Sequence, residues 1–235
     1  MQLARIDQLL TGRAVPFHRP GSSSAIAKAP VAGPLRAGAF GLAGDEQGDL
    51  RVHGGLDKAI HHYPFEHYRR WQERLGPLAL LEAPGAFGEN ISTQGLDETS
   101  LCLGDVLRCG DAVLQVTQSR QPCWKLNERF GVRDMAVQVQ HSGMTGWYYR
   151  VLEPGELQAG QVLRLADRPH PDWPLARIIE LLYQRTQDFD ALARLGELPL
   201  VPAWRRLVER RLGSRQVEDW SHRLYGIAGG DPSRR

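Results

Sequence analysis

The residue whose type and position most clearly suggest a chemical role is Cys123, which lies in the segment QSRQPCWKL. An apolar, strand-like run precedes it, and Pro122 together with the change of pattern at Trp124 predicts a turn from a strand into a helix. The helix start and two nearby cations, Arg120 and Lys125, favour thiolate over thiol, and thiolate is the form that attacks or binds metal. A buried, unreactive cysteine is the other interpretation, because most free thiols in folded proteins are inert.

Four histidines lie close together in the chain, and their spacing matches no compact metal-binding motif such as HExxH. Imidazole titrates near neutral pH, so a histidine at a site can donate or accept a proton. For His53 and His62, a role at a site and a structural role are about equally supported. We expect His61 and His67 to be surface imidazoles in a loop that caps a helix.

A glycine-rich segment, GAFGENISTQG, carries the polar residues Asn90, Ser92 and Thr93. Backbone N–H groups exposed by glycine, beside amide and hydroxyl groups, can cradle an oxyanion or a phosphate, whereas a plain turn is the alternative. The segment lacks both GK[ST] and a properly placed GxGxxG, which excludes a Walker loop and a dinucleotide fingerprint. Upstream, Asp45 and Asp49 form either a carboxylate pair or a turn that satisfies its own backbone.

Short strands are the elements expected to position these residues, because the chain has 25 glycines and 15 prolines among 235 residues. Partial alternation and Gly-Asp breaks predict strands joined by tight turns. The predicted strands span residues 100–109, 112–118, 146–152 and 161–165. One helix is expected between Pro64 and a capping Gly76. Many short strands with frequent turns indicate a β-barrel or a sandwich.

The pattern changes after residue 167, where three prolines form a stiff linker. Three amphipathic helices are expected beyond it, with Val217, Trp220 and Leu224 in a further turn-rich piece. The expected division is residues 1–166 for the barrel, 167–174 for the linker, 175–228 for the helices and 229–235 for a frayed tail.

The amino-acid composition excludes several classes of protein. Hydrophobic residues make up 42% of the chain and the net charge is +2, which argues against disorder and gives no reason to expect a nucleic-acid binder. Three cysteines exclude a disulfide framework, and Cys102 and Cys109 lack zinc-type spacing and are expected in the core. Neither a signal peptide nor a membrane span is evident, so we expect a cytoplasmic protein.

Several motifs together resemble the MOSC domain, the C-terminal domain of molybdenum cofactor sulfurases, and specifically its YiiM-like branch. Each motif is modest alone, but their order is highly specific, and the similarity spans nearly the whole chain. The motifs are SAIAK at 24–28, GLAGDEQ at 41–47, VHGG at 52–55, HYP at 62–64, GAFGENIST at 85–93 and RQPC at 120–123, followed by WRRL at 204–207 and RRLG at 210–213.

The resemblance implies a mainly β fold, a MOSC-type β-barrel with a few helices followed by a small three-helix bundle. It implies a molybdenum cofactor (Mo-pyranopterin) with Cys123 as the thiolate ligand to molybdenum, which suits a soft donor. Pyridoxal phosphate is not expected. The positions that we assign to the cofactor's phosphate and pterin are Lys28, Asn90, Ser92, Thr93 and Arg120.

Family relatives reduce N-hydroxylated compounds, including N-hydroxylated purine bases and hydroxylamines. The resemblance therefore implies a reductase that detoxifies small N-hydroxylated substrates, with His53 and His62 as candidate proton donors. Because His61 and His62 are adjacent in the sequence, it stays open which of the two rings faces the metal. Electrons would come from a separate flavin or iron–sulfur reductase, because the chain has too few cysteines for its own cluster.

Two alternatives stay open. In one, Cys123 carries a persulfide or passes the cofactor to another enzyme. In the other, the chain is a binding module whose C-terminal arginines dock a partner or nucleic acid, although such a run is more often a solvated helix face. A reductase-docking or homodimer surface on these helices is a further expectation. The arginines concerned are Arg205, Arg206, Arg210, Arg211 and Arg215.

Overall fold

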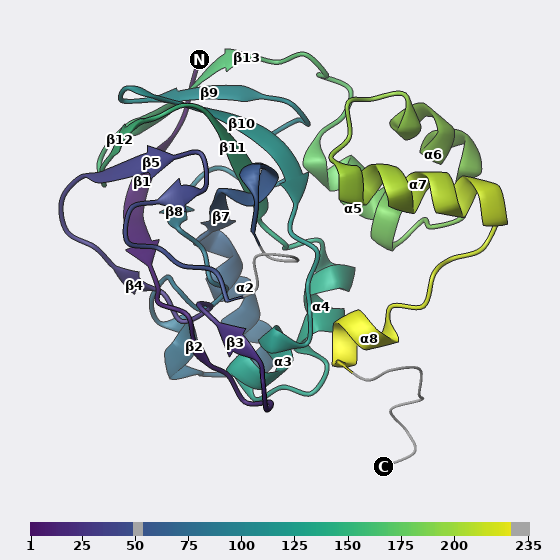
Figure 1. Cartoon of the computed structure of the whole chain (residues 1–235), viewed down its shortest axis with the longest axis horizontal. Coiled ribbons are helices and arrows are strands. Elements are labelled where there is room, and N and C mark those ends of the chain that lie inside the picture. Colours follow the sequence, from purple (N-terminus) through teal and green to yellow (C-terminus); the bar gives the residue numbers. More distant parts are fainter. Residues whose placement is uncertain (49–53, 227–235) are drawn as a thin grey trace. The chain divides into compact units, whose positions relative to one another are not determined.

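The computed structural model describes residues 1–48 and 54–226. Seven strands form a closed barrel in the order β13-β9-β10-β11-β7-β8-β1, and β13 pairs with β1 to complete it (Figure 1). Neighbouring strands are antiparallel except β7 and β8, which run parallel. The barrel strands are β1 (Gln2–Thr11), β7 (Ile60–Pro64), β8 (Ile91–Thr93), β9 (Val106–Cys109), β10 (Ala112–Ser119), β11 (Trp147–Glu153) and β13 (Val162–Asp167). The predicted mainly β, barrel-type fold is confirmed.

Short strands extend this framework. One, β4 (Ala29–Pro30), adds to β1, and five others form two small sheets. The small sheets consist of β12 (Gly155–Leu157), β5 (Leu35–Gly38) and β6 (Gly41–Leu42), and of β2 (Val15–Pro16) with β3 (Ser23–Ser24). Helix α2 (Glu66–Leu75) follows β7 directly and buries Tyr68 and Trp71, and Gly76 ends it with a positive φ, as predicted. Two 3₁₀ turns are also present, η1 (Leu56–Lys58) and η2 (Ala79–Leu81).

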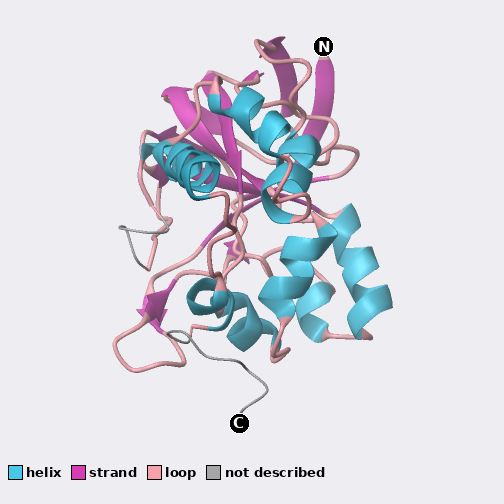
Figure 2. Cartoon of the chain, turned by 90° about the vertical axis from the view of Figure 1, so that its right-hand side faces the viewer, coloured by secondary structure: helices cyan, strands magenta, loops and turns pink. Residues whose placement is uncertain are grey.

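The described chain forms two compact units, and the chain crosses between them more than once. Unit 1 comprises residues 1–120 and 146–174 and holds the barrel; unit 2 comprises residues 121–145 together with the chain from residue 175 onward. The elements of unit 2 are all helices. Figure 2 draws the helices of the chain in cyan and the strands in magenta. They are α3 (Lys125–Phe130), α4 (Met135–Ser142), α5 (Leu175–Tyr183), α6 (Phe189–Gly196), α7 (Pro202–Ser214) and α8 (Ser221–Tyr225).

Three of these helices match the expected amphipathic stripes. Helix α5 buries Ile178 and Leu182, and α6 buries Leu192 and Leu195, as helical spacing requires. Helix α7 starts at Pro202, which suits a first-turn position. The division expected from the sequence placed residues 121–145 with the barrel and not with the C-terminal helices. Local periodicity carries no information on which helices pack together. None of the helices in the described ranges has the length and apolar character needed to cross a bilayer.

Candidate functional site

Lys28 is held by a carboxylate inside unit 1. Its Nζ donates to Asp45 Oδ2 at 2.5 Å, and both side chains are almost fully buried. Burial lowers the pKa of Lys28, although the Asp45 charge opposes this. Asp45 also accepts hydrogen bonds from the Gly12 N–H and from Asn90 Nδ2, each at 2.8 Å. From the sequence, Asp45 is predicted only as one member of a possible carboxylate pair. The other member, Asp49, lies outside the described residues.

Asn90 fixes the backbone around it. Its Nδ2 donates to Leu10 O at 3.1 Å and to Asp45, while its Oδ1 accepts the His61 N–H at 3.0 Å. The backbone of Asn90 also bonds to His61 and Leu10. The amide is therefore engaged on both its donor and its acceptor side, which ties β1, β7 and β8 together. Its assignment to the cofactor stays a prediction.

The glycine-rich segment does form a cradle of backbone N–H groups, and a carboxylate of the protein fills it. Glu89 Oε1 accepts from the Gly85 N–H at 2.7 Å and from the Tyr68 hydroxyl, and its Oε2 accepts from the Phe87 N–H at 3.1 Å. The Tyr68 hydroxyl in turn accepts from the N–H groups of Gly85 and Ala86. The N–H groups of Gly85 and Phe87 thus bind an internal anion, and the signal for this was the glutamate within the motif itself.

Gly85 is required for close backbone packing. Its φ is +113°, and a Cβ built at this position would lie 2.4 Å from Lys28 O. A side chain is excluded there by both conformation and space. The glycine thus allows the segment that bears Lys28 to approach the Glu89 loop.

His62 lies in the hydrogen-bonded interior of the barrel. Its Nδ1 bonds with the Tyr149 hydroxyl at 2.9 Å and its Nε2 with Thr93 Oγ1 at 2.8 Å, and the Trp147 ring centroid lies 4.3 Å from its own. Burial lowers the pKa of His62 to about 3, so the ring is neutral at pH 7. This arrangement supports a structural role for His62 and Thr93. Their roles as proton donor and cofactor contact stay predictions that the geometry does not support.

The expectation that His61 and His67 are surface imidazoles is wrong, because both are buried. The His61 ring packs against Tyr148, with centroids 4.9 Å apart. His67 Nε2 lies 2.8 Å from Glu98 Oε2, and Glu98 Oε1 accepts the Gly146 N–H at 2.7 Å. Strand β7, which carries His61, is buried along its whole length, so no alternation in the sequence marks the burial of that ring. His53 lies outside the described residues.

Arg120 is the last residue of the first of the two segments of unit 1, and it is a buried cation. Its Nη1 donates to Phe87 O at 2.5 Å, and its backbone N–H donates to Gly146 O at 3.0 Å. Over residues 1–48 and 54–226, no carboxylate lies within ion-pair distance of its guanidinium. Ser119 Oγ and Ser92 Oγ are buried and have no hydrogen-bond partner in the same ranges. Sequence reasoning missed Ser119.

Cys123 occupies the predicted place, in the connection between β10 and α3. It is a buried free thiol, and its carbonyl accepts the Leu126 N–H at 3.0 Å in the first turn that leads into α3. Cys102 and Cys109 are also free and buried, as expected for core residues. Burial raises the pKa of both, that of Cys109 to about 11, so neither favours thiolate.

The arginines at positions 205–215 do not form one exposed face, contrary to the alternative of a basic docking surface. Arg211 is fully buried, with Nη1 donating to Leu182 O at 3.1 Å and Nη2 paired with Glu218 Oε1 at 2.6 Å. The Arg205 guanidinium bonds to Leu198 O, and that of Arg215 lies 4.4 Å from the ring centroid of Phe189. The count of charges in the sequence could not separate buried arginines from exposed ones.

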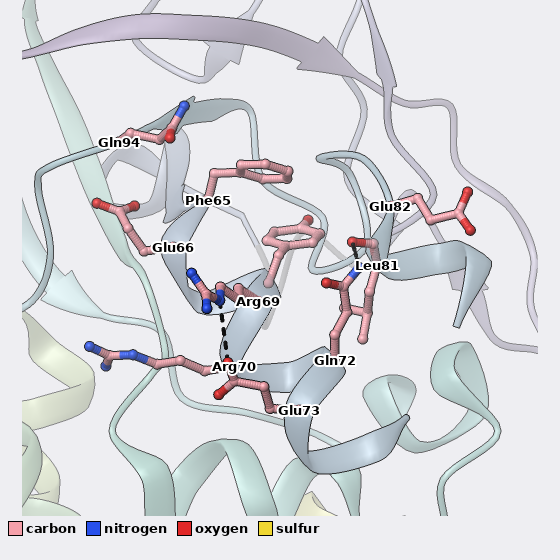
Figure 3. Close-up of a pocket in the computed structure, with 10 residues that line it drawn as sticks. Phe65, Glu66, Arg69, Arg70, Gln72, Glu73, Leu81, Glu82 and Gln94 are labelled. Carbon is pink, nitrogen blue, oxygen red and sulfur yellow. Dashed lines mark hydrogen bonds and ion pairs between the residues drawn. The ribbon is translucent and has the colours of Figure 1, made fainter. Parts of the chain in front are cut away.

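A cavity of about 680 Å³ lies along α2 (Figure 3). Charged side chains at its wall include Arg69 and Glu73, which form an ion pair at 3.3 Å. None of the residues that we assign to the cofactor lines this cavity. In the described part of the chain, no group of three or more His, Cys, Asp or Glu side chains is arranged to hold a metal ion.

Comparison with known protein families matches the chain in two parts. The family model of the MOSC domain matches residues 49–164, and that of the YiiM-like 3-alpha helix domain matches residues 173–215. Protein YiiM of Escherichia coli (strain K12) is 41% identical over 207 residues, which cover 88% of this chain and 92% of that protein.

Two further comparisons concern structure and activity. The crystal structure of YiiM from Escherichia coli superposes with a TM-score of 0.79 at 35% identity, covering 94% of this chain and 99% of that one. A protein named Reductase from Gibberella moniliformis (strain M3125 / FGSC 7600) is 34% identical over 193 residues. This match covers 82% of the present chain and 34% of the fungal protein, so the chain spans about a third of that relative.

Proposed function

Because the chain belongs to the MOSC-domain family and to its YiiM-like branch, we propose that it is a molybdenum-cofactor-dependent reductase of N-hydroxylated compounds. The observation that carries the proposal is the segment from Ser119 to Cys123. Among the described residues, it offers a hydroxyl without a hydrogen-bond partner, a guanidinium without a carboxylate partner and a free thiol, all within five positions. The relative named Reductase supports oxidoreductase activity.

The chemistry of these donor groups fits the cofactor. Cys123 would be the protein ligand, since a soft thiolate suits a transition metal. Arg120 is a planar, permanently charged donor without a carboxylate partner in the described ranges, which suits a phosphate. The buried hydroxyls of Ser92 and Ser119 lack partners there and suit a polar pterin, because buried polar groups are normally hydrogen-bonded.

Lys28 is a poorer candidate for binding the phosphate of the cofactor than its charge suggests. Asp45 already neutralises its ammonium group, and the pair is buried together. Arg120 is therefore the stronger candidate for phosphate, and Lys28 with Asn90 supports the backbone on which the site is built. This ranking refines the assignment made from the sequence.

When bound, the cofactor supplies the electrons that cleave the N–O bond of the substrate. The overall reaction takes up two electrons and two protons, and it converts the N–OH group to N–H with release of water. A separate flavin or iron–sulfur reductase would deliver the electrons. The neutral ring of His62, bonded at both nitrogens, is a poor source of protons at pH 7.

The test compares metal content and turnover. The chain, Cys123→Ala and the matched control Cys109→Ala are produced in a host that synthesises molybdenum cofactor. Molybdenum is measured per chain, and reduction of an N-hydroxylated purine is measured with a chemical electron donor. We expect about one molybdenum per chain and turnover for the parent and Cys109→Ala, and neither for Cys123→Ala.

The outcomes separate the hypotheses. Full metal and activity in Cys123→Ala would refute the ligand assignment. Metal or cyanide-labile sulfur on Cys123 without turnover of any hydroxylamine would instead support a sulfur or cofactor carrier.

A further inference from the structure

The loop that carries Cys123 is held by one residue near the C-terminus, Arg223. Its Nη2 donates to Gln121 O at 2.7 Å, and its Nε donates to Pro122 O at 3.0 Å. Its own carbonyl accepts the Trp124 N–H at 2.8 Å. Arg223 therefore bonds the chain on both sides of Cys123, and all of these residues belong to unit 2.

This contact is specific to arginine. The two carbonyls belong to consecutive residues outside any helix or strand, so no regular ladder satisfies them. A guanidinium is a planar fork with several fixed donors, whereas an ammonium is a single point charge on a flexible stem. Hydrogen bonds from a charged donor are also stronger than those between neutral groups.

Arg223 is itself fixed by its surroundings. Leu224, the next residue, is buried, and its carbonyl accepts from Asn127 Nδ2 at 2.8 Å. The oxygen of the same Asn127 amide accepts the Ala136 N–H at 2.7 Å, so this side chain joins α3, α4 and α8.

A second anchor comes from Arg211, a fully buried residue of α7. Glu218 accepts from Arg211 and also from Trp220 Nε1 at 2.7 Å, directly before α8 begins. The Trp220 ring also lies edge-on to Tyr183 of α5, with the ring centroids 6.0 Å apart. The helix that presents Arg223 is thus connected to the core of unit 2.

We propose that Arg223 is a positioning residue for Cys123, and that bracing the thiol-bearing loop is a role of the C-terminal helices. The importance of this brace for metal binding rests on the proposed function, whereas the brace itself does not. The match to the YiiM-like 3-alpha helix domain ends at residue 215, before Arg223.

The test measures alkylation of each cysteine by iodoacetamide in the full-length chain without cofactor, by mass spectrometry of the cysteine-containing peptides. For Arg223→Ala we expect Cys123 to react about tenfold faster, the factor that corresponds to about 1.4 kcal/mol of lost loop stabilisation. Cys102 and Cys109 report global unfolding and should react at the parent rate. The matched control is Arg210→Ala, at an exposed position on α7, which should leave all three rates unchanged.

The conservative variant Arg223→Lys should give a smaller acceleration at Cys123, because one ammonium cannot reproduce the fork. If Arg223→Ala does not fold, the alkylation rates of Cys123 in Arg223→Lys and Arg223→Gln test the proposal instead. A Cys123 rate equal to that of the parent in the folded variants would overturn the proposal. That result would leave the molybdenum proposal intact, because the latter depends on the metal content of Cys123→Ala.

Discussion

Acidification should destabilise the protein through His62. The pKa of this ring is about 3 in the folded chain against an ordinary value of 6.5, because burial disfavours the charged form. Between these two values the unfolded chain binds a proton that the folded chain does not, so stability rises with pH and is lost as the pH falls below 6.5. At pH 4 the difference spans about 2.5 pH units, which corresponds to about 3 kcal/mol of lost stability.

The assay is urea unfolding at several pH values from 7 to 4, followed by tryptophan fluorescence, for the parent chain and for His62→Gln. Carboxylates also contribute to the pH dependence, but they are common to both proteins. The variant should be less stable at pH 7, because it loses the ring that bonds Tyr149 and Thr93. Its stability should nevertheless fall less steeply with acid, by about 3 kcal/mol over the range.

Equal losses in the two proteins would refute this reasoning. So would an NMR titration that places the pKa of His62 near 6.5 in the folded chain. Either result would mean that the ring is accessible to protons at neutral pH, and His62 would again be a candidate proton donor.

Three single substitutions and one double substitution test the remaining buried contacts. Lys28→Met should destabilise the cofactor-free chain by about 3 kcal/mol, because it leaves Asp45 charged and buried, and adding Asp45→Asn should restore part of the loss in urea unfolding. Gly85→Ala should cost at least about 2 kcal/mol in the same measurement, because of its φ and the close Lys28 carbonyl; an unchanged midpoint would contradict this. Arg211→Met should cost about 3 kcal/mol because it removes the cation that pairs with Glu218, and a neutral effect in thermal unfolding would contradict a stabilising role of this ion pair.

Sequence reasoning located the elements that keep a regular pattern. The strands β10, β11 and β13, helix α2 and the three long C-terminal helices follow from alternation or helical spacing and from their glycine and proline boundaries. The longest strand, β1, was missed. Its register shifts between Ile6 and Gln8, so Leu9 and Leu10 are both buried and the alternation is broken.

The candidate site was predictable only as a set of residue types. Motif spacing identified Cys123 at a strand-to-helix turn, and the structure places it there. Partners from separate segments could not be inferred, since the pairing of Lys28 with Asp45 and of Asn90 with Leu10 depends on how these segments meet in three dimensions. Arg223 lies about 100 residues from the loop that it binds, and no local pattern marks such a contact.

That separation along the chain has a consequence for biosynthesis. Residues 121–124 leave the ribosome well before Arg223 does, so the hydrogen bonds that fix the loop cannot form until about 100 further residues have been made. Until then, α3 and α4 also lack the C-terminal helices with which they form one compact unit. The loop around the thiol therefore cannot complete its hydrogen bonds before Arg223 is present, and a chain truncated after residue 174 would never complete them.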